Sequence, residues 1–168
     1  MADVLEKDFI SPQASLRKAF SMFPTGVVAI CAMEGNNPVG MAVNSFSSVS
    51  LEPALVAVCV ANTSTTWPRL ATARRLGLSV LGADQEMVSR RLSSRTGDRF
   101  ENVPWETNGH GAVFVNGATL WLDCSIHDCL RGGDHEIILL EVQTAQLFPE
   151  IAPLVFHQSQ YLGLLATP

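Results

Sequence analysis

Short apolar segments, separated by turn residues, recur along most of the chain and predict a mainly β structure. Each segment is rich in β-branched residues or alternates apolar with polar positions, and both patterns are typical of strands. The predicted strands are residues 27–33, 39–43, 55–60, 76–81, 118–130, 135–148 and 154–156. The turn sequence Gly-Asn-Asn-Pro at 35–38 joins the first two strands, which predicts a hairpin.

Three other segments carry helix signals. The first helix is expected to begin at Ser11, whose side chain can cap it, and to end before Pro24. A second helix is predicted over residues 64–74. A third is predicted to begin with Asp84 as its N-cap and to stop at Gly97.

Strands outnumber helices and hairpins join them, so the expected fold is mainly β with a few helices (α+β). An antiparallel barrel with helices at its ends fits this order of elements. Residues 98–111 are expected to form a loop, and an N-terminal arm, residues 1–12, precedes one domain of residues 13–168. The chain has no Gly-x-Gly-x-x-Gly motif, so a nicotinamide nucleotide, if used, is not held by a Rossmann unit.

The composition favours a self-associating protein that binds neither nucleic acid nor membrane. Apolar residues make up 47% of the 168 residues and charged residues only 16%, which predicts apolar surface buried in a homodimer. The net charge of −5 gives no global attraction to nucleic acid or to an anionic membrane. With no apolar stretch of membrane-spanning length and no secretory signal, we expect a cytoplasmic protein with four free cysteines and no metal.

Basic residues gather between Arg69 and Arg99. This segment holds seven of the 11 basic residues of the chain and three acidic ones. Solvated helix faces are the common explanation for such a run. A local positive field in an acidic protein would instead suit a phosphate-bearing ligand, and the sequence alone leaves both interpretations open.

Small hydroxyl and amide side chains gather in two segments that border predicted strands. Residues 40–50, GMAVNSFSSVS, carry one Asn and four Ser where a strand is expected to open into a loop. Residues 62–70, NTSTTWPRL, place three hydroxyl residues at a predicted helix start, where free N–H groups can bind phosphate. A solvated loop and ordinary N-capping are the alternative explanations.

The sequence RGGDH at 131–135 lies between the two longest predicted strands. The glycines and the aspartate are typical turn residues, so the turn leaves only His135 to be explained. A neutral imidazole can both donate and accept a hydrogen bond, although a single histidine at a strand end is commonly a surface residue. No Ser/His/Asp or Cys/His set and no paired carboxylates stand out, so we expect any chemistry to belong to a bound cofactor.

Eight segments occur in an order that is typical of one protein family. Together they resemble the flavin reductase-like family, the small reductase components of two-component flavin monooxygenases, over about residues 14–165. The segments are FPTGVVAI (23–30), GMAVNSFSSVSLEPALVAVCV (40–60), NTSTTWPRL (62–70), LSVLGADQ (78–85), DRF (98–100), LDC (122–124), GGDHEIILLEV (132–142) and PLVFHQSQY (153–161).

The resemblance implies a fold, an activity and a partner. It implies a split β-barrel of the FMN-binding type that forms a homodimer. It also implies NADH- or NADPH-dependent reduction of FMN or FAD, with the reduced flavin released to a partner flavin-dependent monooxygenase. The alternative is a flavoprotein that retains FMN tightly as a binding or sensing module.

The resemblance also implies site residues, carried over by position. His135 is the expected catalytic residue, with an orienting role. The expected cofactor-binding residues are Thr25 and Gly26 near the flavin, Asn44, Ser45, Ser48, Val49 and Ser50 along its ring and ribityl side, Ser64 and Thr66 at its phosphate, Arg99 and Phe100 in a closing loop, Gly133 and Asp134 beside His135, and Tyr161 in the C-terminal segment.

The chain departs from the family pattern at three places. A threonine that is frequent in the family is absent where Ala42 and Val43 stand. The pair at 101–102 is Glu-Asn instead of the usual Ala-Gly, and the pair at 158–159 is Gln-Ser instead of a frequent Arg-Gly. The last two departures bear on the nicotinamide or adenosine contacts and not on the flavin site.

Overall fold

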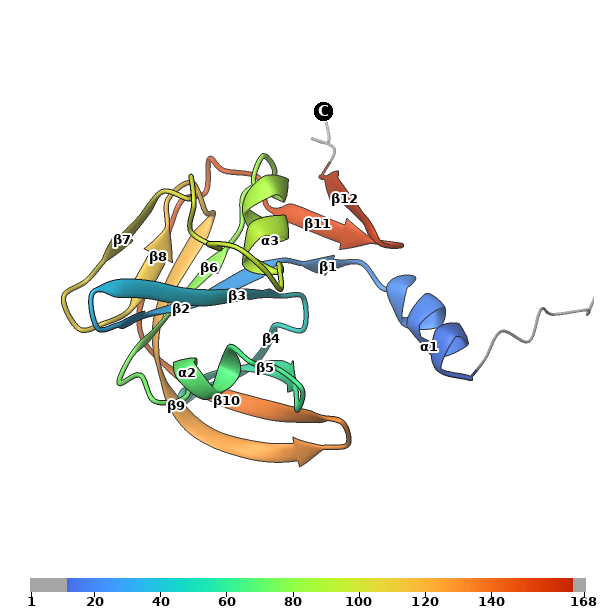
Figure 1. Cartoon of the computed structure of the whole chain (residues 1–168), viewed down its shortest axis with the longest axis horizontal. Coiled ribbons are helices and arrows are strands. Elements are labelled where there is room, and N and C mark those ends of the chain that lie inside the picture. Colours follow the sequence, from blue (N-terminus) through green and yellow to red (C-terminus); the bar gives the residue numbers. More distant parts are fainter. Residues whose placement is uncertain (1–11, 165–168) are drawn as a thin grey trace, which may run out of the picture.

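One seven-stranded antiparallel sheet forms most of the protein, as the computed structural model shows (Figure 1). The structure describes residues 12–164. Strands β3 and β4 are the two edge strands of this sheet. In spatial order, the strands are β3 (Asn37–Val43), β2 (Val28–Glu34), β6 (Leu76–Val80), β9 (Leu120–Gly132), β10 (His135–Leu147), β5 (Ala54–Ala61) and β4 (Ser47–Leu51).

The sheet wraps around its core but does not close into a barrel. Buried side chains of β2, β3, β5, β6, β9 and β10 form a single apolar cluster, as expected if the sheet curves around them. No ladder joins β3 to β4 in the part of the chain that the structure describes. The prediction of a mainly β, antiparallel fold with a few helices is therefore confirmed, and the sheet stays open because its two edge strands do not pair with each other.

Two small sheets and two of the three short helices pack against this sheet, whereas the N-terminal helix stands away from it (Figure 1). A second apolar cluster joins one face of β2 to the small sheets and to the helix that ends at Leu92. The small sheets are β1 (Thr25–Gly26) with β11 (Leu154–His157) and β12 (Gln160–Gly163), and β7 (Trp105–Thr107) with β8 (Val113–Val115). The helices are α1 (Pro12–Ser21), α2 (Trp67–Leu70) and α3 (Glu86–Leu92). Within residues 12–164, no helix is long and apolar enough to cross a membrane.

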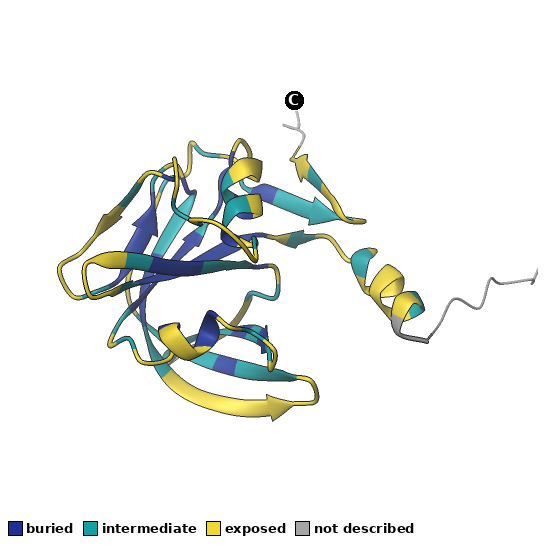
Figure 2. Ribbon diagram, viewed as in Figure 1, coloured by how far each residue is buried: buried dark blue, intermediate teal, exposed yellow. Residues whose placement is uncertain are grey.

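Apolar side chains remain exposed on α1, which stands away from the sheets (Figure 1). Phe20 is 70% exposed, and Phe23, just after the helix, is 74% exposed. Figure 2 shows the same exposure along most of α1 and along the outer part of the β9–β10 hairpin. Soluble chains rarely leave such side chains uncovered, so these two surfaces are candidates for association.

The helix predictions hold less well than the strand predictions. The helix expected over residues 64–74 is only Trp67–Leu70, because the chain turns after Leu70 and enters β6 at Leu76. Asp84 is not the N-cap of α3. Gln85 takes that position and is buried, since its side chain accepts a hydrogen bond from the Gly82 N–H and donates one to the carbonyl oxygen of Asn116.

Several boundaries differ from the predictions for local reasons. Helix α3 ends at Leu92 and its C-cap is Ser93, so Gly97 lies beyond the helix and does not stop it. The expected loop over residues 98–111 contains the short strand β7, and β12 follows β11, which was expected to be the last strand. These two strands are mostly exposed and too short for a clear alternation. Strands β1, β4 and β8 were not predicted either, and β4 lies where a loop was expected. The proposed cap Ser11 lies outside the described residues.

Candidate functional site

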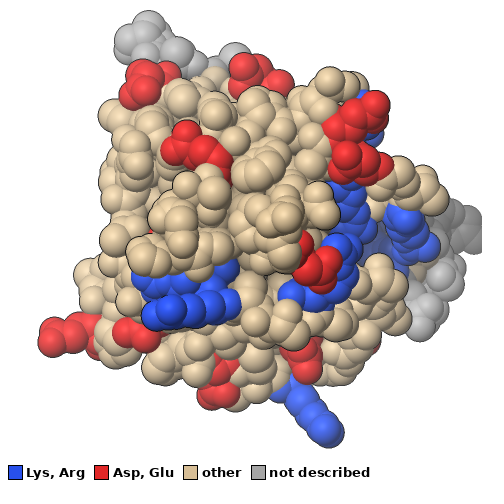
Figure 3. Space-filling view, turned by 60° about the vertical axis from the view of Figure 1, so that its left-hand side comes forward, with Lys and Arg blue, Asp and Glu red and all other residues tan. Residues whose placement is uncertain are grey.

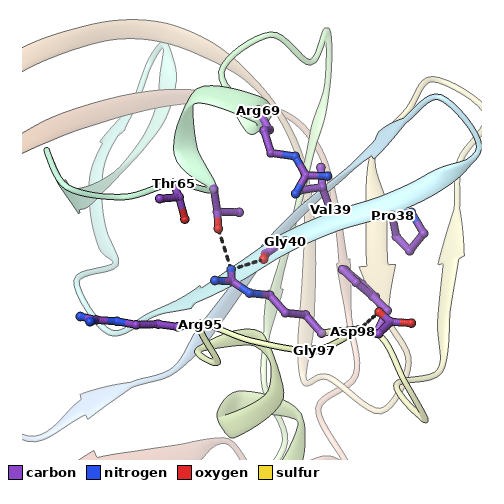
Figure 4. Close-up of a pocket in the computed structure, with 11 residues that line it drawn as sticks. Pro38, Val39, Gly40, Thr65, Arg69, Arg95, Gly97 and Asp98 are labelled. Atoms are coloured by element: carbon purple, nitrogen blue, oxygen red, sulfur yellow. Dashed lines mark hydrogen bonds between the residues drawn. The ribbon is translucent and has the colours of Figure 1, made fainter.

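Two cavities lie along β3, and they contain part of the predicted site. The first, here called the arginine cavity, has a volume of about 300 Å³ (Figure 4). It is lined by Pro38, Val39, Gly40, Thr65, Thr66, Arg69, Arg95, Gly97, Asp98, Arg99 and Phe100. Its walls come from β3, from the start of α2 and from the segment that follows α3. Three segments far apart in sequence therefore meet there.

Arg99 connects the three walls of the arginine cavity. Its guanidinium Nη1 donates to Thr66 Oγ1 at 2.7 Å and to the carbonyl oxygen of Gly40 at 2.9 Å (Figure 4). A Cβ atom at Gly40 would lie 2.5 Å from Cys31 Sγ and 3.0 Å from Phe100 Cζ, so a side chain does not fit there. The glycine lets the Arg99–Phe100 segment approach β3 closely.

The arginine cavity concentrates positive charge. Arg69 is paired with the Glu34 carboxylate, which raises the pKa of Arg69 and lowers the pKa of Glu34. Burial lowers the pKa of Arg99, and the nearby charge of Arg69 lowers it further. The bonds of Arg99 go to neutral acceptors, and Arg95 adds a third guanidinium to the lining. Like charges gathered around one cavity suit an anionic ligand.

Basic side chains form several groups on the surface. Figure 3 shows Lys and Arg in separate groups on one face of the molecule, some of them next to Asp or Glu. Of the two interpretations of the basic segment, the arrangement of Arg69, Arg95 and Arg99 around one cavity favours the phosphate-bearing ligand. Arg90 instead agrees with the solvated-face interpretation, because it pairs with Glu86 one turn earlier on α3.

The second cavity, here called the tyrosine cavity, measures about 200 Å³. It is lined by Val27, Ala42, Val43, Asn44, Ser89, Ser93, Phe156 and Tyr161. The hydroxyl groups of Tyr161 and Ser89 lie 2.9 Å apart, and the Arg90 guanidinium lies 5.1 Å from the centre of the Tyr161 ring. These contacts hold the ring of Tyr161, which lies on β12, against α3. The ring forms an aromatic wall of the cavity that suits a flat ligand.

Strand β3 brings the two cavities close together. Gly40 lines the arginine cavity, whereas Ala42 and Asn44 line the tyrosine cavity. Gly40 and Asn44 are four residues apart, or about 13 Å along a strand. A ligand with a flat ring at one end and a phosphate on a flexible chain at the other fits this spacing and this chemistry.

The predicted serine residues are mostly engaged by the protein itself. The Ser45 hydroxyl accepts from the Cys59 N–H at 2.8 Å and donates to the Cys59 carbonyl oxygen at 3.0 Å. Ser64 accepts from the Trp67 N–H at 3.1 Å, whereas the N-cap of α2 is Thr66, whose side chain makes no capping hydrogen bond. Ser48 and Val49 are exposed on the edge strand β4, where a bulge leaves Val49 unpaired.

The predicted turn at Gly133–His135 packs against the start of the segment 62–66. The Asn62 N–H donates to the Asp134 carbonyl oxygen at 2.9 Å, and the Asn62 side chain donates to the Gly133 carbonyl oxygen at 3.3 Å. His135 Nδ1 lies 2.7 Å from Asp134 Oδ1, and this hydrogen bond lowers the pKa of Asp134. His135 is partly exposed and does not line either cavity.

Thr25 leaves a polar atom without a partner next to the tyrosine cavity. Its hydroxyl oxygen is buried and makes no hydrogen bond, although buried hydroxyl groups are almost always paired. Thr25 pairs with Phe156 across β1 and β11, and Phe156 lines the tyrosine cavity. Gly26, the next residue, has open space where a Cβ would stand. The unpaired hydroxyl here suits the polar edge of a flat ring, and the cationic groups at the other cavity suit a phosphate.

Some lining residues were not predicted from the sequence. Among them, Thr65, Arg69 and Arg95 line the arginine cavity. Ser89 and Phe156 line the tyrosine cavity. The run of three hydroxyl residues and the excess of basic residues over 69–99 were signals for the first group, but they did not indicate which members face a ligand. Ser89 lies on a helix with no motif that distinguishes it. Among residues 12–164, no cluster of His, Cys, Asp and Glu could hold a metal ion.

Comparison with known proteins places this architecture in a family. The model of the flavin reductase like domain matches residues 20–165, which is most of the chain. The chain belongs to the flavin reductase-like family. Among curated relatives, the flavin reductase of Pseudomonas putida is 34% identical over 167 residues, covering 99% of this chain and 98% of its own length. The NADH-dependent FAD reductase of Streptomyces globisporus is 37% identical and covers 89% of this chain and 84% of its own length.

Solved structures of flavin reductase-like proteins share the fold. The Streptomyces globisporus NADH:FAD oxidoreductase SgcE6, in complex with NAD and FAD fragments, has a TM-score of 0.86 at 36% identity, covering 98% of both chains. BorF, the flavin reductase component of a bacterial two-component tryptophan halogenase, has a TM-score of 0.83 at 33% identity, covering 92% of this chain and 99% of its own. The family expected from the sequence motifs is therefore confirmed.

Proposed function

We propose that the protein is an NAD(P)H:flavin oxidoreductase that reduces FMN or FAD and supplies the reduced flavin to a partner monooxygenase. Relatives that are 30% or more identical include an NADH-dependent FAD reductase and the reductase subunits of flavin-dependent monooxygenases. The observation that carries the proposal is the pair of cavities along β3, one with three guanidinium groups and one with an aromatic wall.

The proposed roles of the residues follow from what each can contact. Arg99 and Thr66 would bind the flavin phosphate, because they already meet at the arginine cavity. Thr25 and Asn44 would donate or accept at the polar edge of the ring. When flavin and NAD(P)H are both bound, hydride passes from nicotinamide C4 to flavin N5. His135, held by Asp134, would orient the nicotinamide, and no acid or base is required for that transfer.

An assay with four substrate pairs tests this proposal. Purified protein is mixed with NADH or NADPH and with FMN or FAD, and nicotinamide oxidation is followed by absorbance. We expect turnover with at least one pair, and the rates identify the preferred flavin and nucleotide. Yellow protein after gel filtration that does not oxidise either nucleotide would support the alternative, a module that retains FMN. No flavin binding at all would refute both.

We further propose that the protein is a cytoplasmic homodimer. Exposed apolar side chains on α1 and near it, such as Phe20 and Phe23, support association. The four cysteines are unpaired, which agrees with a reducing compartment. Light scattering coupled to gel filtration is expected to give twice the chain mass. Phe20→Ser should shift the protein toward monomer, whereas Met87→Ser, an exposed position on α3, should not.

A further inference from the structure

A separate basic cavity opens beside the middle of the β9–β10 ladder. Its volume is about 390 Å³, and it shares no lining residue with the arginine cavity or the tyrosine cavity. Arg74 and Arg75 reach it from the segment before β6, and His110 from the loop between β7 and β8. Ser125 on β9 and Gln143 on β10 complete the wall. We call this the ladder cavity.

The strand pairing positions Gln143 at the ladder cavity. Residues on either side of it pair regularly, Val142 with Cys124 and Thr144 with Asp123, so Gln143 is the extra residue of a β-bulge. A bulge redirects the side chain of its extra residue and often occurs beside binding sites. The side-chain amide of Gln143 donates to the Ser125 hydroxyl at 3.2 Å. This bond fixes one polar wall of the cavity.

A buried network positions the opposite wall. Asp123 is only 4% exposed and lies 3.3 Å from an Arg75 guanidinium nitrogen. The same carboxylate oxygen of Asp123 accepts from the Asn108 side-chain amide at 2.7 Å. Asn108 in turn accepts from the His110 N–H at 3.0 Å. Arg75 and the loop that carries His110 are therefore held in place by one buried carboxylate, which is the arrangement expected of a preorganised site.

The polar groups around the ladder cavity are mainly donors. Two guanidinium groups line it, and none of its described lining residues is acidic. The Asp123 Oδ2 beside Arg75 accepts from Asn108, whereas the buried Asp123 Oδ1 has no hydrogen-bond partner. Ser125 still has its own O–H to donate, and His110 adds ring N–H capacity. Glu141 pairs with Ser125 across the ladder but does not line the cavity. An excess of cationic donors over acceptors suits an oxyanion.

We propose that the ladder cavity is a binding site for a small phosphate- or carboxylate-bearing molecule, separate from the flavin site. The ligand's oxyanion would be held by Arg74 and Arg75, with Ser125 as a neutral donor. Ser125 lies 10 positions before His135 and Gln143 lies 8 positions after it. The ladder cavity and His135 therefore share the paired strands β9 and β10.

Amide NMR spectra of nitrogen-15-labelled protein test this proposal with inorganic phosphate and succinate as probes. Each anion is added at constant ionic strength, with chloride as the balancing salt. We expect saturable shifts of the Ser125 and Gln143 amides. Saturation by phosphate alone, by succinate alone or by both supports the site and identifies the oxyanion that it prefers.

Variants separate this site from the arginine cavity, which can also attract phosphate. Arg74→Ala is expected to weaken the Ser125 and Gln143 response about tenfold, the usual effect of losing one charge-assisted contact. Arg99→Met should leave that response unchanged while it removes the response of the Thr66 amide. Arg131→Ala, an exposed arginine outside both cavities, is the matched control. Shifts that do not saturate, that chloride reproduces, or that persist in Arg74→Ala would overturn the proposal.

Discussion

Replacing Arg99 by methionine tests whether the arginine cavity binds the flavin through its phosphate. Methionine has a similar length and keeps the apolar contacts of the side-chain stem, but it removes the charge and both hydrogen bonds, to Thr66 Oγ1 and to the Gly40 carbonyl oxygen. The variant therefore changes the anion-binding chemistry of the cavity more than it changes its shape. We expect weaker binding of FMN and unchanged binding of riboflavin, which lacks the phosphate.

The magnitude follows from the surroundings of Arg99. A hydrogen bond to a charged group contributes about 1.5–3 kcal/mol, which corresponds to about 10- to 150-fold in Kd. Arg99 is partly exposed, so solvent screening places the effect near the lower limit. Removing its charge also relieves the repulsion from Arg69, which offsets part of the stability lost with the two bonds. We expect about tenfold weaker FMN binding and a free energy of unfolding lower by about 1 kcal/mol.

Titration of flavin fluorescence measures both dissociation constants, and thermal unfolding checks that the variant is folded. Arg131→Met is the control, since Arg131 is exposed and lines neither cavity. The effect on FMN should also shrink as salt concentration rises, because exposed charges are screened. Equal losses for FMN and riboflavin would refute the assignment of Arg99 to the phosphate, and so would unchanged FMN binding in a folded variant.

Four further substitutions probe the chemistry, the backbone and the packing. His135→Ala should slow hydride transfer in stopped-flow experiments more than it weakens flavin binding, and unchanged NADH oxidation would contradict the orienting role. Ser159→Gly should raise the unfolding free energy by about 1 kcal/mol because Ser159 has a φ of 62°, whereas Asn102→Gly, at 58°, should gain less since Asn tolerates this region. Gly77→Ala should cost about 3 kcal/mol or more in chemical denaturation, because its Cβ would lie 2.1 Å from the Val113 carbonyl oxygen.

The strands were predictable because their signal is local. Residues 135–148 were expected to be one long strand, and β10 is His135–Leu147. Periodicity within one segment decides such an assignment, and no distant contact is needed. The helix after Ser64 was overestimated because propensity and capping favoured ten residues, whereas the chain must reach β6 at Leu76. Tertiary connections determined the helix length, and a local pattern does not contain them.

The residue types of the site could be predicted from the sequence, but the hydrogen-bond partners of those residues could not. Thr66, Arg99 and Phe100 were expected near the flavin, and they do line one cavity together. Ser45, however, has the right chemistry at the right place in the motif, yet both hydrogen-bonding functions of its hydroxyl are used by Cys59, 14 positions away. Sequence alone shows that a hydroxyl is present, but only the fold shows whether the backbone of another strand already engages it.

The departures from the family pattern have a structural consequence that the sequence could not show. Asn102 and Ser159 stand where the family pattern described above has glycine, and both adopt a positive φ. Glycine takes this conformation without steric cost, whereas a residue with a side chain is strained in it. Such a strained residue is retained when its side chain or its rigidity contributes something else. Ser159 precedes Tyr161 by two residues, so the strain lies in the hairpin that positions the wall of the tyrosine cavity. If Ser159→Gly gains stability and also loosens that wall, the serine contributes to ligand binding by restricting the hairpin.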